Sequence, residues 1–147
     1  MILVDEYAAL PTLAARPRRE LQGNIQALTY GRAYRLTRAL LDPGPGRLQA
    51  RGRFTRLVDA LSPDGHHALH ERLANPDPAV LRIIDPRPMI RTTGAIQNTY
   101  AVSLLQAETL AAAVTHEWPI RFADPSGATE PVRRAATELG LDLRVLS

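Results

Sequence analysis

Three short apolar runs decide the fold: AVLRIID at residues 79–85, PIRFAD at residues 119–124 and LDLRVL at residues 141–146. Each run is rich in Leu, Ile, Val or Phe, and proline or glycine stands beside it. This pattern is typical of short buried strands bounded by turns.

Helical patterns separate these runs. We expect a short helix over residues 88–100 and a longer one, rich in leucine and alanine, over residues 104–116 that Ser103 can cap. Pro131 suits the first turn of a last helix, which Gly140 closes. Strands that alternate with helices predict an α/β fold, a parallel sheet covered by helices on both faces in a three-layer sandwich.

The first half of the chain is predicted to be mostly helical. Ile2–Asp5 is a strand rather than a signal peptide, because no basic leader precedes the apolar run. Leucine and isoleucine recur near helical spacing over residues 19–41, which predicts one helix or, if Gly23 and Gly31 interrupt it, two. The sequence DPGPG at residues 42–46 predicts the end of this helical segment. Two further helices are expected over residues 54–61 and 66–73.

Composition limits the class of protein. The chain has 147 residues, which predicts one domain over residues 1–147. It has no cysteine, so disulfides, cysteine nucleophiles and thiolate metal sites are excluded. No apolar run reaches the length of a membrane span, and we expect a soluble, cytoplasmic protein without membrane contact.

The positive charge is concentrated in one part of the chain. All 18 basic residues are arginine, and residues 16–56 carry ten of them against two acids, a net charge of +8, whereas the rest carries −5. Arg32, Arg35 and Arg38 recur at helical spacing with Tyr34 among them, a pattern suited to phosphates and stacked bases. A solvated helix face, or a surface for an acidic protein, would have the same pattern.

Three acids are predicted to follow strands. Asp5, Asp85 and Asp124 each end an apolar run, and the carboxyl ends of parallel strands share one edge of the sheet. Carboxylates there form a candidate site for Mg²⁺ or Mn²⁺. Alternatively, such acids cap the helices that follow the strands.

The second half of the chain resembles PIN domains, the nuclease fold of bacterial toxins. The likeness lies in an alanine-rich helix at residues 103–113, a strand ending in an acid at residues 118–124, and the stretches 134–136 and 139–141. Ile2–Asp5 is similar to the family's first strand with its first acid. The resemblance implies a parallel-sheet PIN-like fold and a magnesium-dependent endoribonuclease whose acids hold one or two cations.

This sequence departs from the family's pattern of four acids. Asp5 matches the first acid and Asp124 the last. Gln106 stands where the third is expected, and Glu108 is the nearest replacement. The neighbourhood of the second, residues 30–35, holds no acid.

Two functions follow from the resemblance. The first is the toxin component of a toxin–antitoxin type system, a metal-dependent ribonuclease with Asp5, Glu108 and Asp124 at its site and Arg32, Arg35, Arg38 and Tyr34 on the RNA. The second is a catalytically silent PIN-like module that binds RNA or an antitoxin protein through its arginine-rich helix. The family's habit implies a homodimer in either case.

Overall fold

Five parallel strands form the sheet at the centre of the molecule. The computed structural model describes residues 1–41 and 53–147. The order of the strands is β3-β2-β1-β4-β5, so the first strand of the chain lies in the middle. The strands are β1 (Ile2–Val4), β2 (Gln26–Thr29), β3 (Leu81–Ile84), β4 (Ile120–Phe122) and β5 (Leu143–Val145).

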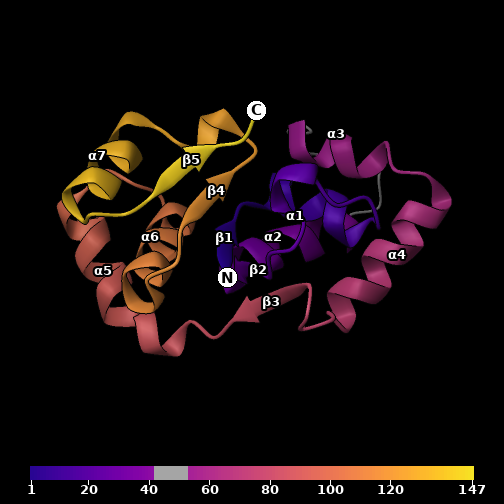
Figure 1. The fold of residues 1–147 in the computed structure, drawn as a ribbon, viewed down its shortest axis with the longest axis horizontal. Helices are drawn as coiled ribbons and strands as arrows, with labels where there is room; N and C mark the ends of the chain where they lie inside the picture. The colour runs from indigo at the N-terminus through magenta and orange to yellow at the C-terminus, as the bar shows by residue number, and fades with distance from the viewer. Residues whose placement is uncertain (42–52) are drawn as a thin grey trace.

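The sheet lies between two layers of helices, with α5, α6 and α7 on one side and α3 and α4 on the other (Figure 1). Successive strand residues face opposite layers: Leu3 packs in the core beneath α5, α6 and α7, and Val4 in the core beneath α1, α2 and α4. No helix among the described residues is long and apolar enough to cross a membrane. These helices are α1 (Glu6–Leu13), α2 (Tyr30–Leu41), α3 (Arg53–Asp59), α4 (Pro63–Ala74), α5 (Ile90–Thr99), α6 (Leu104–His116) and α7 (Glu130–Glu138), with short 3-10 turns at Arg19–Leu21, Arg87–Met89 and Pro125–Gly127.

Most elements predicted from the sequence are present. The three apolar runs contain β3, β4 and β5, and all strand pairs are parallel. Ser103 caps α6 in a capping box: its hydroxyl accepts from the Gln106 backbone N–H at 3.3 Å, and the Gln106 side chain accepts from the Ser103 backbone N–H at 2.8 Å. Gly140 follows α7 with a φ of +67°, the left-handed conformation that glycine adopts readily.

The predicted helix over residues 19–41 is wrong in its first half. Among these residues α2 is the one α-helix, Arg19–Leu21 form a single 3-10 turn, and Gln26–Thr29 form a strand instead. All four residues of that strand are buried, because it lies inside the sheet and its side chains pack into the cores on both faces. Burial on both faces removes the alternation of apolar and polar residues that would identify a strand, and two of the four buried side chains, Gln26 and Thr29, are polar. The predicted stop at residues 42–46 lies outside the described residues.

The connections between strands define a crevice at one edge of the sheet. The chain passes from β1 to β2 and β3 on one side, then crosses back to β4 on the other side of β1. The connections that follow β1 and β4 therefore leave in opposite directions, and ligand sites of parallel sheets lie at the carboxyl ends of such strand pairs. Asp5 and Asp124 follow these two strands.

Candidate functional site

A pocket of about 200 Å³ lies at the carboxyl ends of β1 and β4. Four parts of the chain line it: the start of α1, one side of α2, the start of α6, and the turn after β4. Three carboxylates and two guanidinium groups face one another there, so the pocket carries a net charge of −1 when all five are ionised. The lining residues are Asp5, Glu6, Tyr7, Arg32, Arg35, Ser103, Leu105, Gln106, Asp124, Ser126 and Gly127.

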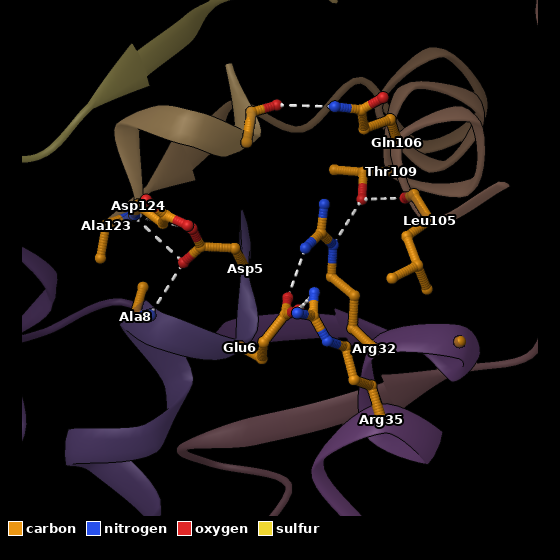
Figure 2. A network of polar contacts seen from close by, with 12 residues as sticks. Asp5, Glu6, Ala8, Arg32, Arg35, Leu105, Gln106, Thr109, Ala123 and Asp124 are labelled. Carbon is orange, nitrogen blue, oxygen red and sulfur yellow. Dashed lines mark hydrogen bonds and ion pairs between the residues drawn. The ribbon is translucent and has the colours of Figure 1, made fainter. Parts of the chain in front are cut away.

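Asp5 joins α1 to the end of β4 (Figure 2). Its carboxylate accepts from the backbone N–H groups of Ala8 at 2.8 Å, Asp124 at 2.9 Å and Ala123, which both oxygens share at 3.0 and 3.1 Å. The side chain is buried, and burial raises its pKa above the ordinary value, although the three N–H groups and the charge of Arg32 act to lower it. Asp5 is therefore a helix cap whose lone pairs already have partners.

Asp124 lies beside Asp5 as predicted, and it is also a cap. One oxygen accepts from the Ser126 backbone N–H at 3.1 Å, and the other accepts from the Ser126 hydroxyl at 2.5 Å. Only 7% of the residue is exposed. The structure thus brings the two outer acids of the predicted set together, and both serve the turns that follow their strands.

The main charge network of the pocket contains a residue that the sequence analysis missed. Glu6 is fully buried and forms ion pairs with Arg32 and, at 2.5 Å, with Arg35. The Arg32 Nε donates to the Thr109 hydroxyl at 2.9 Å, and its guanidinium lies 5.0 Å from the centre of the Phe122 ring. A signal in the sequence could have identified this network. Glu6 directly follows the strand-end acid Asp5, and Arg32 and Arg35 lie three residues apart on a predicted helix.

The two candidates for the third acid lie in different places. Gln106 lines the pocket, and its amide donates to the Gly127 carbonyl at 3.2 Å (Figure 2). Glu108 does not line the pocket. Its carboxylate accepts from the Gly31 backbone N–H at 3.1 Å, at the first turn of α2. The structure therefore does not bring Glu108 to Asp5.

The predicted RNA-binding arginines do not share one exposed side. Arg32 is 4% exposed and points into the pocket, Arg35 lies at the pocket with about half its side chain exposed, and Arg38 and Tyr34 are exposed. Residues three positions apart on a helix differ by about 60° in direction, so Arg38 lies about 120° from Arg32 and faces solvent while Arg32 faces the core.

Asp85 does not join the other two strand-end acids. β2 lies between β3 and β1, which separates Asp85 from Asp5 by two strand spacings, or about 10 Å. Its carboxylate is partly exposed and pairs with Arg87 at 2.6 Å. The prediction of three converging acids is therefore wrong for Asp85.

The donor set of the pocket does not fit a divalent cation. Mg²⁺ and Mn²⁺ need several carboxylate or water oxygens with open lone pairs. Here backbone donors surround Asp5, two guanidinium groups neutralise Glu6, and Arg32 places its own positive charge in the pocket. Among the residues that the structure describes, no three His, Asp or Glu side chains are grouped so that they could hold a metal ion.

Comparison with known proteins supports the fold. The structure is similar to the crystal structure of FitAcB from Neisseria gonorrhoeae, with a TM-score of 0.53 and 18% sequence identity over 97% of this chain and 96% of that chain. No protein-family model and no curated protein matches the chain. The predicted fold class is confirmed, because the chain has an α/β fold with a parallel sheet in a PIN-like three-layer sandwich. At this level of identity the likeness shows the fold alone.

Proposed function

We propose that this chain is a PIN-like component of a toxin–antitoxin type system that acts by binding an antitoxin-like protein and has no metal-dependent step of its own. The PIN-like fold and the likeness to FitAcB support the type of system. One observation carries the choice of binding over catalysis: the Arg32 guanidinium, paired with Glu6, lies in the pocket that a cation would enter. A cytoplasmic location and a homodimer belong to the same proposal.

Electrostatics support a pocket without a metal ion. A divalent cation about 5 Å from a guanidinium meets a repulsion of roughly 7 kcal/mol at an effective dielectric constant of about 20. That repulsion cancels the attraction of one carboxylate at the same distance. Arg32 and Arg35 together offset two of the three acids in the pocket. The remaining charge of −1 is small for holding an ion that must also lose part of its hydration shell.

An exposed strip on α2 supports binding to a protein. Tyr30 and Tyr34 are each 56% exposed and Leu41 is 71% exposed. Their positions fall within about 40° of one another around the helix, and Arg38 borders them. A leucine has no ring on which a base could stack, so an apolar strip with arginine at its edge suits an amphipathic, acidic protein segment better than RNA.

Co-expression with a candidate antitoxin, a protein with an acidic amphipathic segment, tests this proposal. We expect the two proteins to purify together, and the double substitution of Tyr30 and Tyr34 by Asp to weaken binding at least 100-fold by calorimetry, on the order of two interface hot spots. Ile90→Asp is the matched control, because Ile90 is 63% exposed but lies on α5 in the other helical layer. Equal binding by the α2 variant would contradict the proposed surface.

A metal-dependent ribonuclease is the second candidate, and the meeting of Asp5 and Asp124 beside β1 and β4 favours it. In that case these two acids would hold Mg²⁺ or Mn²⁺, while Tyr34 and Arg38 would contact the RNA. Hydrolysis of labelled RNA in millimolar Mg²⁺ or Mn²⁺ distinguishes the candidates. Cleavage by the wild type that Asp124→Asn abolishes would replace the binding proposal with this one.

A further inference from the structure

Arg32 has one donor group that the protein does not use. Its Nε donates to Thr109, and one terminal nitrogen donates to Glu6. The other terminal nitrogen forms no hydrogen bond with any residue that the structure describes. Figure 2 shows that nitrogen pointing away from Glu6, into the pocket between Asp5 and Gln106. A guanidinium that is almost fully buried therefore presents positive charge to the centre of the pocket.

The three buried carboxylates of the pocket require a nearby positive charge to compensate their own negative charges. Asp5, Glu6 and Asp124 are 2%, 0% and 7% exposed. Carboxylates taken out of water and placed around one small space repel one another, unless a cation or a proton compensates them. The charge of Arg32 acts on Asp5 as well as on its direct partner Glu6.

We infer that Arg32 is a built-in counter-cation, and that it supplies from within the chain the positive charge that Asp5, Glu6 and Asp124 would otherwise take from a divalent metal ion. Removing that charge opens a latent site for Mn²⁺ or Mg²⁺. This inference rests on the proposed function, because it assumes that the wild-type pocket holds no metal.

The size of the pocket is compatible with a latent site. A volume of about 200 Å³ corresponds to roughly six or seven water molecules at about 30 Å³ each. Loss of the guanidinium enlarges the space and frees one side of the Glu6 carboxylate. A cation that keeps most of its waters can then reach the Glu6 and Asp124 carboxylates, the kind of mixed protein and water shell that Mg²⁺ prefers. Asp5 keeps its backbone partners and contributes only its charge.

Mn²⁺ titration of Arg32→Gln tests the inference. Glutamine removes the charge and keeps a polar side chain. We expect no binding by the wild type at about 1 mM Mn²⁺, and a Kd of about 0.1–1 mM for the variant, in the range of weak carboxylate sites. In about 10 mM Mn²⁺ the melting temperature of the variant should rise by roughly 4–8 °C. Arg38→Gln is the matched control, since it removes the same charge from the exposed side of α2 and should behave as the wild type.

The outcomes of this titration distinguish failure of the counter-cation inference from failure of the proposed function. If the folded Arg32→Gln variant and the wild type both fail to bind Mn²⁺, the counter-cation inference is wrong and the proposed function stands. If the wild type binds Mn²⁺ as well as the variant does, the metal-free premise of the proposed function fails too. Equal binding by Arg38→Gln would show a general charge effect and overturn the inference.

A variant that does not fold in plain buffer remains informative. Its circular dichroism signal should recover in about 10 mM Mn²⁺ and not in NaCl of equal ionic strength, because only the divalent ion replaces the lost charge at the pocket. Absence of recovery in Mn²⁺ would count against the inference.

Discussion

Asp5→Asn is the substitution that an activity test of the pocket would use first, and we expect it to destabilise the fold. The native carboxylate accepts from three backbone N–H groups, those of Ala8, Ala123 and Asp124. An asparagine has one acceptor oxygen. Whichever way the amide is turned, its NH₂ group faces at least one N–H donor and leaves that donor without a partner.

The cost can be worked out from these contacts. Loss of the helix cap at Ala8 costs about 1–2 kcal/mol. The bonds to Ala123 and Asp124 change from charged to neutral, which costs about 1 kcal/mol each. Relief from burying a charge offsets part of this, since burial is the main cause of the raised pKa of Asp5. The expected net loss is about 2–4 kcal/mol in the free energy of unfolding at neutral pH.

Urea denaturation followed by circular dichroism measures this loss. Asp85→Asn is the control: the same substitution after another strand, at an exposed acid that pairs with Arg87 on the surface. Solvent screening makes its effect much smaller. A loss below about 1 kcal/mol for Asp5→Asn would refute the network described here, and a loss of RNA cleavage in that variant could then be assigned to chemistry.

Three further predictions concern charged groups. In a double-mutant cycle measured by urea denaturation, Arg32→Met and Glu6→Gln should each cost about 3 kcal/mol, because the first leaves the buried Glu6 with Arg35 alone and the second leaves the buried Arg32 without its ion-pair partner. The double variant should cost less than the sum of the two, and strict additivity would contradict the buried pair. Glu108→Gln should cost about 1 kcal/mol by weakening the bond to the first turn of α2, and it should leave Mn²⁺ affinity in the Arg32→Gln background unchanged if the carboxylate lies outside the pocket. Carbon NMR titration should find the pKa of Asp5 above its ordinary value, because of burial, and that of Asp142 below it, because of Arg121. The contribution of Asp142 to stability is present above its unfolded-state pKa and is lost as pH falls through its native pKa. The contribution of Asp5 changes in the opposite direction, because it increases as pH falls through the raised native pKa. If urea denaturation of the two Asp→Asn variants gave the same direction of pH dependence for both residues, these pKa shifts would be wrong.

The sequence predicted the second half of the fold well because its signals are local. Proline, glycine and the Ser103 cap mark the ends of elements, and a short apolar run between them fits few other structures. β2 was missed because its identity depends on its neighbours: Gln26–Thr29 is a strand since it lies between β1 and β3. Spacing within the chain does not contain that information.

The site was predicted in part for the same reason. Asp5 and Asp124 follow strands, and two parallel strands that turn out to be neighbours bring them together. Glu6 was missed because its role depends on Arg32, which is 26 residues away and reaches it from another helix. The choice between a metal ligand and an ion pair is decided by which cation is nearest in space, and the sequence alone does not show that.

The central position of β1 has a consequence for synthesis of the chain. β1 leaves the ribosome before β2 and β4, the two strands that pair with it, and its neighbour Asp5 accepts from backbone N–H groups 118 and 119 positions later in the chain. At about 5–20 residues per second, translation separates these partners by roughly 6–24 s. During that time Asp5 lacks its two backbone partners from the end of β4. The pocket therefore assembles only after β4 has been made, and until then the nascent segment that contains β1 and Asp5 is a natural target for chaperones.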